Sequence, residues 1–174
     1  MLTNGKLIRL RKPEEEDLDI ALEWFKKGDH FMAGDLPVSS IDLRDMVLNQ
    51  IKAPSSYDSN TYLVIETIEG VPIGMILFHS TNWKDRNAVM DVYFLEDKAK
   101  DDYALDAFLT AIVFAFQELN LHKIRICLSE QEDNLVRIVE KIGAKREQVL
   151  RKHLYRQGKY HDVSVYGLLR MEFG

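Results

Sequence analysis

Cysteine is nearly absent from this chain of 174 residues, in which Cys127 is the single example. One cysteine excludes an internal disulfide and leaves no cysteine cluster that could hold a structural zinc ion. The first residues lack the charged and then apolar pattern of a signal peptide, and no apolar run approaches the roughly 20 residues that span a bilayer. These absences together predict a cytoplasmic protein without a membrane partner.

Positive charge is scarce relative to negative charge, because 23 Lys and Arg residues against 28 Asp and Glu residues give a net charge of −5. A domain that binds duplex nucleic acid usually presents a basic face, so nucleic acid is not expected as a partner. A local basic group does occur toward the C-terminus, and its pattern favours the solvated faces of strands. Its members are Lys145, Arg146, Arg151, Lys152, Arg156 and Lys159.

Linker-like stretches, internal repeats and low-complexity tracts are absent as well, so a single domain over residues 1–174 is predicted. Alternating and helical hydrophobic periodicities predict strands and helices in a regular order. The predicted strands are 5–11, 61–67, 71–79, 88–95, 123–128, 144–156 and 160–171, about seven in all, and the predicted helices are 13–27, 41–53, 101–119 and 133–142.

Strand 88–95, helix 101–119 and strand 123–128 form a β-α-β unit, in which the two strands should be parallel neighbours. Short connections make most of the other strand pairs antiparallel. The predicted fold class is therefore α/β (α+β), with a mixed, mostly antiparallel central sheet and helices on both of its faces.

This order of elements resembles that of the GNAT superfamily of N-acetyltransferases, and local stretches resemble the family too. Residues 115–124 resemble the end of its central helix and the strand that follows, and residues 140–144 resemble the end of its next helix. Leu150-Arg151, residues 158–163 and Leu168-Leu169 resemble its closing hairpin. The likeness covers roughly residues 5–173 and is similar to the branch that acetylates ribosomal-protein N-termini, amino sugars and related amines.

The resemblance implies acetyl-CoA as co-substrate, and a small-molecule or peptide amine as acceptor, with no metal ion. Strands 88–95 and 123–128 would then splay apart, and backbone groups of the first strand would hold the pantetheine arm and polarise the thioester carbonyl. The amine attacks directly and gives a tetrahedral intermediate, so no nucleophilic side chain is required. The cofactor-binding residues implied in this strand are Val92, Tyr93, Phe94 and Leu95.

The family's pyrophosphate motif is eroded in this sequence. Both of its glycine positions carry side chains, Lys100 and Asp102, and only Tyr103 and Ala104 still match the family as cofactor-binding residues. Glycines let phosphates approach the backbone of a helix N-terminus, and carboxylates there oppose an anion. The negative charges in this window belong to Asp97, Asp101 and Asp102.

Two further family positions also depart from the pattern. The usual asparagine falls at Glu132, so that Asn134, two residues away, is the candidate replacement for contacting the cofactor. The tyrosine that protonates the leaving thiolate falls at Val139, which carries no proton. An alternative function therefore stays open, namely a catalytically impaired GNAT-fold protein that serves as a ligand-binding or protein-interaction module.

Asp91 is the candidate general base, because strand alternation places Asp91 and Tyr93 on one face of the sheet and Val92 and Phe94 on the other. The competing interpretation is a polar residue on a solvated sheet face. Tyr155 is the candidate general acid in the closing hairpin. The other hairpin residues that could replace it are His153, Tyr160 and His161, and all four could equally be surface or packing residues.

The remaining residues with reactive side chains are assigned structural roles. His79 and His122 are predicted to be structural, and Cys127 is predicted to be a small core residue. The loop residues Phe31, Met32, Leu36 and Pro37 either cover the acceptor pocket or simply pack onto the sheet. Dimerisation through the C-terminal hairpin is implied by analogy with the family alone.

Overall fold

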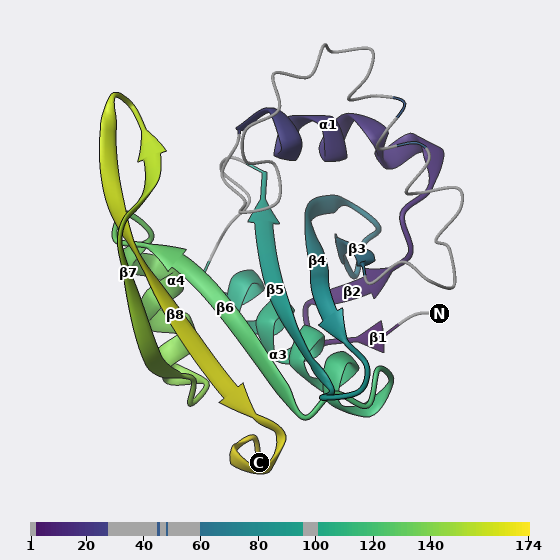
Figure 1. The fold of residues 1–174 in the computed structure, drawn as a ribbon. Coiled ribbons are helices and arrows are strands. Elements are labelled where there is room, and N and C mark those ends of the chain that lie inside the picture. Colours follow the sequence, from purple (N-terminus) through teal and green to yellow (C-terminus); the bar gives the residue numbers. More distant parts are fainter. Residues whose placement is uncertain (1–2, 28–44, 46–47, 49–59, 96–100) are drawn as a thin grey trace.

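The computed structural model describes residues 3–27, 45, 48, 60–95 and 101–174 (Figure 1). Its strands are β1 (Thr3–Asn4), β2 (Ile8–Arg11), β3 (Thr61–Thr67), β4 (Pro72–Asn82), β5 (Asn87–Phe94), β6 (Lys123–Ser129), β7 (Lys145–Arg156) and β8 (Lys159–Leu169). Its helices are α1 (Leu18–Lys27), α3 (Asp101–Gln117) and α4 (Asp133–Lys141), with short 3-10 turns η1 (Glu15–Asp17) and η3 (Arg170–Glu172).

The eight strands form one sheet in the order β1-β2-β3-β4-β5-β6-β8-β7. Every neighbouring pair is antiparallel except β5 and β6, which are parallel and joined through α3. The predicted mixed, mostly antiparallel sheet and its β-α-β unit are therefore confirmed. The element bounds differ little from the predicted ones, but the strand count is eight among the described residues rather than seven.

The additional strand is β1 (Thr3–Asn4), which precedes the predicted strand 5–11, and of that predicted strand only residues 8–11 are extended, as β2. Gly5 donates its N–H to the carbonyl of Ile8 at 2.9 Å and so turns the chain between them. The carboxylate of Asp106 in α3 accepts hydrogen bonds from the N–H groups of Leu7 and Ile8, at 2.6 and 3.1 Å. The turn therefore depends on a contact with a residue about 100 positions away in the chain. The local alternation of apolar and polar residues cannot predict such a turn.

Each face of the sheet packs against its own helices. The larger core lies between the sheet and α3 and α4, where Phe78, Met90 and Phe108 are completely buried. The smaller core lies between the other face and α1, where Leu18 and Ala21 contact side chains of β3, β4 and β5. Because alternate residues of a strand enter the two cores, the sheet presents two chemically distinct faces along β5 and β6.

The closing hairpin of β7 and β8 matches its prediction closely. Gln157 and Gly158 both have positive φ, 49° and 78°, as a tight two-residue turn between twisted strands requires. Most β7 side chains are exposed, and β7 forms an edge of the sheet. The basic residues of this strand, which include Lys145 and Arg151, therefore lie in solvent as expected for a protected edge.

Some predicted features lie outside the described residues. They are the loop 28–39 with Phe31, Met32, Leu36 and Pro37, most of helix 41–53, and residues 97–100 of the pyrophosphate window. Asp45 and Leu48 are described and are helical. Among the helices that the structure describes, none is long and apolar enough to cross a membrane.

An ion-pair network fixes the start of α1 to the sheet. Arg11 in β2 donates two hydrogen bonds to the carboxylate of Asp17, at 2.6 and 2.9 Å, and a third to Glu66 in β3 at 2.6 Å. Asp17 is only 2% exposed. Both carboxylates raise the pKa of the Arg11 guanidinium above its usual range, with the bond to Asp17 as the largest cause. Arg11 therefore compensates a buried negative charge whose other described hydrogen bond comes from the uncharged N–H of Glu14.

We expect Arg11→Met to destabilise the protein by about 3 kcal/mol, since it removes the cation that pairs with the buried Asp17 carboxylate. The matched control is Arg9→Met in the same strand, where Arg9 reaches only the exposed carbonyl of Ile68, and its expected cost is below about 1 kcal/mol. Urea unfolding of both variants measures the difference. Equal losses for the two variants would contradict the assigned role of Arg11.

Candidate active site

β5 and β6 pair only at their beginning and then separate. Three residue pairs join them, Asn87 with Lys123, Ala88 with Ile124 and Val89 with Arg125. Beyond this point both strands continue, β5 as far as Phe94 and β6 as far as Ser129, without pairing to each other. Figure 1 shows β6 leaning away from β5 over this distance. The sheet therefore contains a wedge between two parallel strands, as the family resemblance implied.

Each strand beside the wedge keeps an antiparallel partner on its outer side. The residues of β5 from Asp91 to Phe94 stay paired with β4, and those of β6 from Ile126 to Ser129 stay paired with β8. The wedge thus has two regular walls, and among the described strands none pairs with the backbone groups on its inner side.

The alternation of backbone hydrogen bonds decides which groups of β5 face the wedge. Leu95 donates its N–H to the carbonyl of Ile73 at 2.9 Å, and so it faces β4. Successive residues of a strand direct their N–H groups to opposite sides, so Tyr93 also faces β4 whereas Val92 and Phe94 face β6. Of the four predicted cofactor-binding residues, Val92 and Phe94 direct their amides into the wedge. The amides of Tyr93 and Leu95 face β4, where that of Leu95 donates to Ile73.

Gly74 in β4 lies opposite Phe94 and sets the position of this wall. A Cβ atom at Gly74 would lie 2.1 Å from the carbonyl oxygen of Tyr93 and 3.1 Å from Cα of Phe94. Since no real Cβ contact is this short, any side chain here would push the end of β5 away from β4 and toward β6. Glycine at this position therefore keeps the wedge open.

Asp91 lies where β5 and β6 part, on the face that packs against α1. Its side chain is buried, with the residue 8% exposed, so the alternative of a solvated sheet face is wrong. Its Oδ2 atom lies 3.1 Å from Nε2 of His79, which is 4% exposed. Nδ1 of His79 lies 3.0 Å from Oγ of Ser80. His79, predicted to be structural, therefore belongs to a buried polar pair at the apex of the wedge.

Cys127 lies across the wedge from Asp91. Ile126 and Leu128 enter the larger core, so alternation turns Cys127 to the Asp91 face. Burial raises the pKa of the Cys127 thiol to about 11, with the Asp91 carboxylate adding to the rise and Arg125 opposing it. The thiol stays protonated near neutrality, which excludes the thiolate required of a cysteine nucleophile. Cys127 is only partly buried and belongs to neither core, so the prediction of a core residue is wrong.

The other predicted cofactor-binding residues occupy varied surroundings. Tyr103 packs partly buried against the larger core, and Ala104 lies wholly within it. Asn134, in the first turn of α4, accepts a hydrogen bond from Arg137 at 3.2 Å. Glu132 accepts a hydrogen bond from the N–H of Ser129 at 2.7 Å, and Val139 is completely buried. Glu132 and Val139, which replace the family's usual asparagine and tyrosine, therefore have structural roles in this chain: one binds a backbone amide and the other packs in the core.

Tyr155, the predicted acid, lies beside the tip of the hairpin and is 62% exposed. Its ring contacts that of Tyr160, with the ring centres 5.0 Å apart. The described contacts do not bring it together with Asp91. His161 differs from both tyrosines, because it is buried and its Nδ1 lies 3.0 Å from a carboxylate oxygen of Glu130. Among the hairpin candidates described, His161 has the surroundings closest to those of a proton-transferring group.

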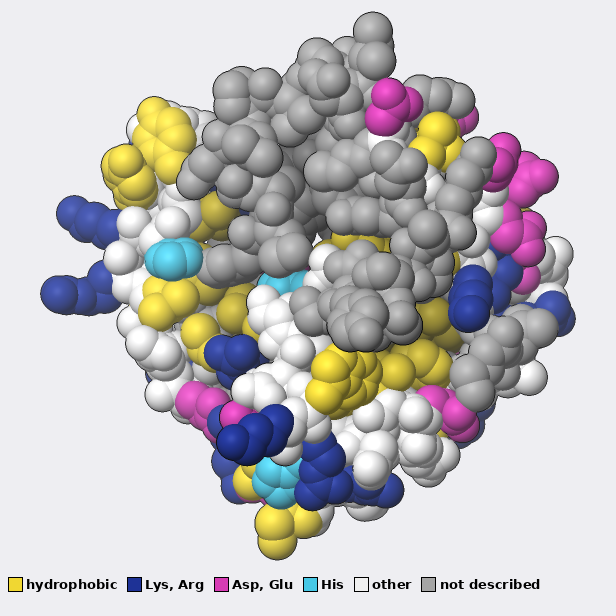
Figure 2. All heavy atoms as spheres, turned by 45° about the vertical axis from the view of Figure 1, so that its right-hand side comes forward, with side chains coloured by type: hydrophobic (Ala, Val, Ile, Leu, Met, Phe, Trp, Pro, Cys, Tyr) yellow, Lys and Arg dark blue, Asp and Glu magenta, His cyan; other side chains and the backbone are white. Residues whose placement is uncertain are grey.

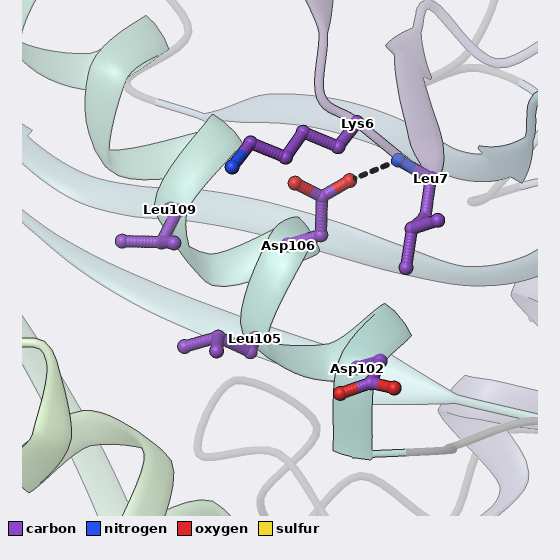
Figure 3. A pocket seen from close by; sticks show the side chains of 6 residues that line it. All are labelled: Lys6, Leu7, Asp102, Leu105, Asp106 and Leu109. Atoms are coloured by element: carbon purple, nitrogen blue, oxygen red, sulfur yellow. Dashed lines mark hydrogen bonds between the residues drawn. The ribbon is translucent and has the colours of Figure 1, made fainter.

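A separate hollow of about 300 Å³ lies between the β1–β2 turn and α3. Figure 3 shows Asp106 in this hollow with its carboxylate turned to the N–H of Leu7, and Lys6 extended above it. Leu105 and Leu109 supply its apolar lining. In the sheet order, β3 and β4 lie between the β2 side of this hollow and the wedge, and the Asp106 carboxylate already stabilises the turn. The lining residue that the hollow shares with the pyrophosphate window is Asp102, in the first turn of α3.

On the face shown in Figure 2, Lys and Arg side chains are interspersed with Asp and Glu side chains around the edge, so charge on this face does not single out another site. Among the residues that the structure describes, no three His, Cys, Asp or Glu side chains come together in a group that could hold a metal ion. The wedge with its Asp91–His79 pair is therefore the candidate active site.

We expect Cys127 to react with iodoacetamide about 100-fold more slowly at pH 8 in the folded protein than in urea, because its raised pKa leaves that much less thiolate. The reaction is followed by the mass of the protein. Its rate should rise about tenfold for each pH unit up to about pH 10, which separates a raised pKa from simple steric protection. Similar rates in the folded and unfolded states would contradict the assignment.

The chain is similar in sequence to known acetyltransferases. A family model described as an acetyltransferase (GNAT) domain matches residues 8–145. The Bacillus subtilis protein named "Putative ribosomal N-acetyltransferase YdaF" is 29% identical over 126 residues, which are 72% of this chain and 63% of YdaF. The uncharacterized N-acetyltransferase YoaA of the same organism is 26% identical over 98 residues, 56% of this chain and 55% of YoaA. The chain thus matches less than two thirds of the length of each of these relatives.

A solved structure with the same fold is spermidine N-acetyltransferase from Vibrio cholerae in complex with CoA and spermine, with a TM-score of 0.82. The two sequences are 20% identical, and the superposition covers 97% of this chain and 98% of the other. At this identity the likeness establishes the fold alone. With the family match over residues 8–145, it leads to one conclusion: the chain belongs to the GNAT acetyltransferase family.

Proposed function

We propose that this protein is an acetyl-CoA-dependent N-acetyltransferase that acts on a primary amine by direct transfer through a tetrahedral intermediate. The observation that carries the proposal is the wedge between β5 and β6, into which Val92 and Phe94 direct amide groups that no described strand pairs with. Acetyl-CoA supplies the activated acetyl group as a thioester. Amide donors fixed in a strand can stabilise negative charge on its carbonyl oxygen without reorganising during the reaction.

Asp91 is proposed as the group that takes the proton from the incoming ammonium. Its position at the apex of the wedge sets a carboxylate beside the place where the acetyl group would lie, and the neighbouring Cys127 is a neutral thiol. A buried carboxylate attracts a cationic amine, and removing the ammonium proton gives the nucleophile that direct transfer requires. The prediction that Tyr155 protonates the leaving thiolate gains no support from its exposed position.

The acceptor is proposed only as a class, a primary amine on a small molecule or at a protein N-terminus. The names of the similar proteins include a ribosomal N-acetyltransferase and a spermidine N-acetyltransferase, and both names fit this class. The net charge of −5 suits an acceptor that arrives as a cation.

A second candidate function is a GNAT-fold module that binds another ligand or a protein partner without catalysis. It is favoured by three positions that depart from the family pattern. Asp102 stands exposed in the first turn of α3, where the pyrophosphate would lie, and its carboxylate fits a phosphate poorly. Glu132, at the usual asparagine position, accepts the N–H of Ser129, and Val139, at the position of the usual acid, is completely buried. The amides of Val92 and Phe94 nevertheless fit the pantetheine arm.

Two measurements separate the candidates. Calorimetry with acetyl-CoA measures binding, and mass spectrometry after incubation with acetyl-CoA detects transfer to spermidine, glucosamine and a peptide with a free N-terminus. The proposal predicts binding and a gain of one acetyl group on at least one of these amines. Binding without transfer to any amine would favour the non-catalytic module, and no heat at millimolar acetyl-CoA would remove the proposal.

We expect Gly74→Ala to weaken acetyl-CoA binding at least about tenfold, because its Cβ would displace the end of β5 and narrow the wedge. Gly70→Asn is the matched control. Gly70 lies in the β3–β4 turn with a φ of 88°, no atom lies within 4 Å of the position that a Cβ would take there, and Asn tolerates this backbone. Thermal melting checks that both variants fold. Unchanged acetyl-CoA affinity in folded Gly74→Ala would contradict the role given to the wedge.

A further inference from the structure

The contacts of Asp91 continue beyond its pair with His79 and lead from the interior to the surface. Asp91 and His79 are both buried, at 8% and 4% exposed, whereas Ser80 is exposed to solvent. The three side chains form a continuous chain, from Asp91 Oδ2 to His79 Nε2 at 3.1 Å and from His79 Nδ1 to Ser80 Oγ at 3.0 Å. Every distance lies within hydrogen-bonding range.

A regular strand could not make the second of these contacts. Neighbouring residues of a strand point to opposite faces of the sheet, so Ser80 would lie across the sheet from the His79 ring. The pairing of β4 with β5 shifts between His79 and Asn82, and Ser80 has a φ of 50°, in the left-handed region that non-glycine residues seldom adopt. The irregularity turns Ser80 back to the imidazole. Such bulges re-aim side chains and concentrate beside active sites.

We propose that His79 and Ser80 form a proton exit route, which moves the proton of the acceptor ammonium from Asp91 to bulk water. The inference rests on the proposed function, in which Asp91 faces the amine. His79 acts through Asp91 and is therefore a positioning and proton-relaying residue. Among the described residues, no hydrogen bond engages Oδ1 of Asp91, so this oxygen can receive the proton while Oδ2 stays on His79.

The proton balance is complete with these groups. The relay starts with a protonated His79, whose Nε2–H donates to Oδ2 of the Asp91 carboxylate and whose Nδ1–H donates to Oγ of Ser80. The ammonium gives one proton to Oδ1 of Asp91 and becomes a neutral amine, and the Nδ1 proton of His79 leaves through Ser80 to water, so that one proton enters the pair and one leaves it. After the product departs, Oδ1 loses its proton to water and Nδ1 regains one, which restores the starting state. The buried pair carries no net charge before and after the transfer, which a low-dielectric site accommodates better than a lone charge.

The other ionisable groups near this pair do not offer the same route. Cys127, on β6, keeps its proton because burial raises its pKa to about 11. Arg125, on the same strand, carries a permanent positive charge and cannot accept a proton. His161 is a second buried imidazole, but its Nδ1 is held by Glu130 on the hairpin side rather than by Asp91. The His79–Ser80 pair is the described path that joins Asp91 to solvent.

The test compares His79→Gln, Ser80→Ala and the control His122→Gln, where His122 is an exposed histidine before β6. Steady-state acetyl transfer gives kcat, and calorimetry gives the Kd for acetyl-CoA. We expect His79→Gln to lower kcat about 100-fold and Ser80→Ala several-fold, with Kd unchanged in both and the control at the level of the unaltered protein. Imidazole added to a His79→Ala variant should restore part of the lost kcat.

The possible failures are distinguishable. Absence of transfer by the unaltered protein would overturn the proposed function itself. Full kcat in folded His79→Gln, or a loss of kcat that imidazole does not restore and that is matched by weaker acetyl-CoA binding, would overturn the relay alone. Ser80→Ala changes an exposed side chain and keeps the buried pair, so an unchanged kcat in this variant would place the proton's exit elsewhere even if the His79 variants do not fold.

Discussion

The site depends on where the backbone hydrogen bonds between β5 and β6 end. β5 stays paired with β4 along its length and β6 stays paired with β8, while their shared pairing ends after Val89 and Arg125. Backbone amides within a sheet are otherwise satisfied by a neighbouring strand. The separation therefore leaves inward-facing groups of Val92 and Phe94 available to a ligand, and Gly74 allows β4 to hold β5 in that position.

The two faces of the sheet give the wedge different surroundings on its two sides. The α3 and α4 side is a continuous apolar core, whereas the α1 side carries Asp91 and His79 above the smaller core. The Arg11 network joins β2 and β3 to the start of α1. It thereby holds α1, the helix that covers the second side, against the sheet. A ligand in the wedge would thus meet backbone donors in the sheet and proton-accepting side chains on the α1 face.

Much of the fold could be predicted because its signals are local. Periodicity located the strands, the long apolar helix and the β-α-β unit, and the turn residues located the closing hairpin. The β1–β2 break could not be found this way, because it depends on Asp106 contacting Leu7 and Ile8 from a distant helix. The wedge itself was implied by the family resemblance and not by the residues of β5 and β6.

The candidate site could be predicted only in part, because some of its contacts join residues that no local pattern connects. Asp91 and the strand that carries Val92 and Phe94 were identified from alternation and resemblance, but the partner of Asp91 was not. A bulge at Ser80 changes the register between β4 and β5, so counting along the two strands does not bring the His79 ring, Ser80 and Asp91 together. The proposed dimer through the hairpin stays a prediction, and the described features that bear on it are the exposure of β7 and the exposed rings of Tyr155 and Tyr160.

Residue-resolved amide hydrogen exchange, measured by NMR with and without acetyl-CoA, tests the central claim most directly. Without ligand, the amides of Val92 and Phe94 should exchange faster than those of Tyr93 and Leu95, which face β4. Acetyl-CoA should slow the exchange of Val92 and Phe94 and leave the other two nearly unchanged. Equal protection of all four amides without ligand, or no response of Val92 and Phe94 to bound acetyl-CoA, would contradict the account.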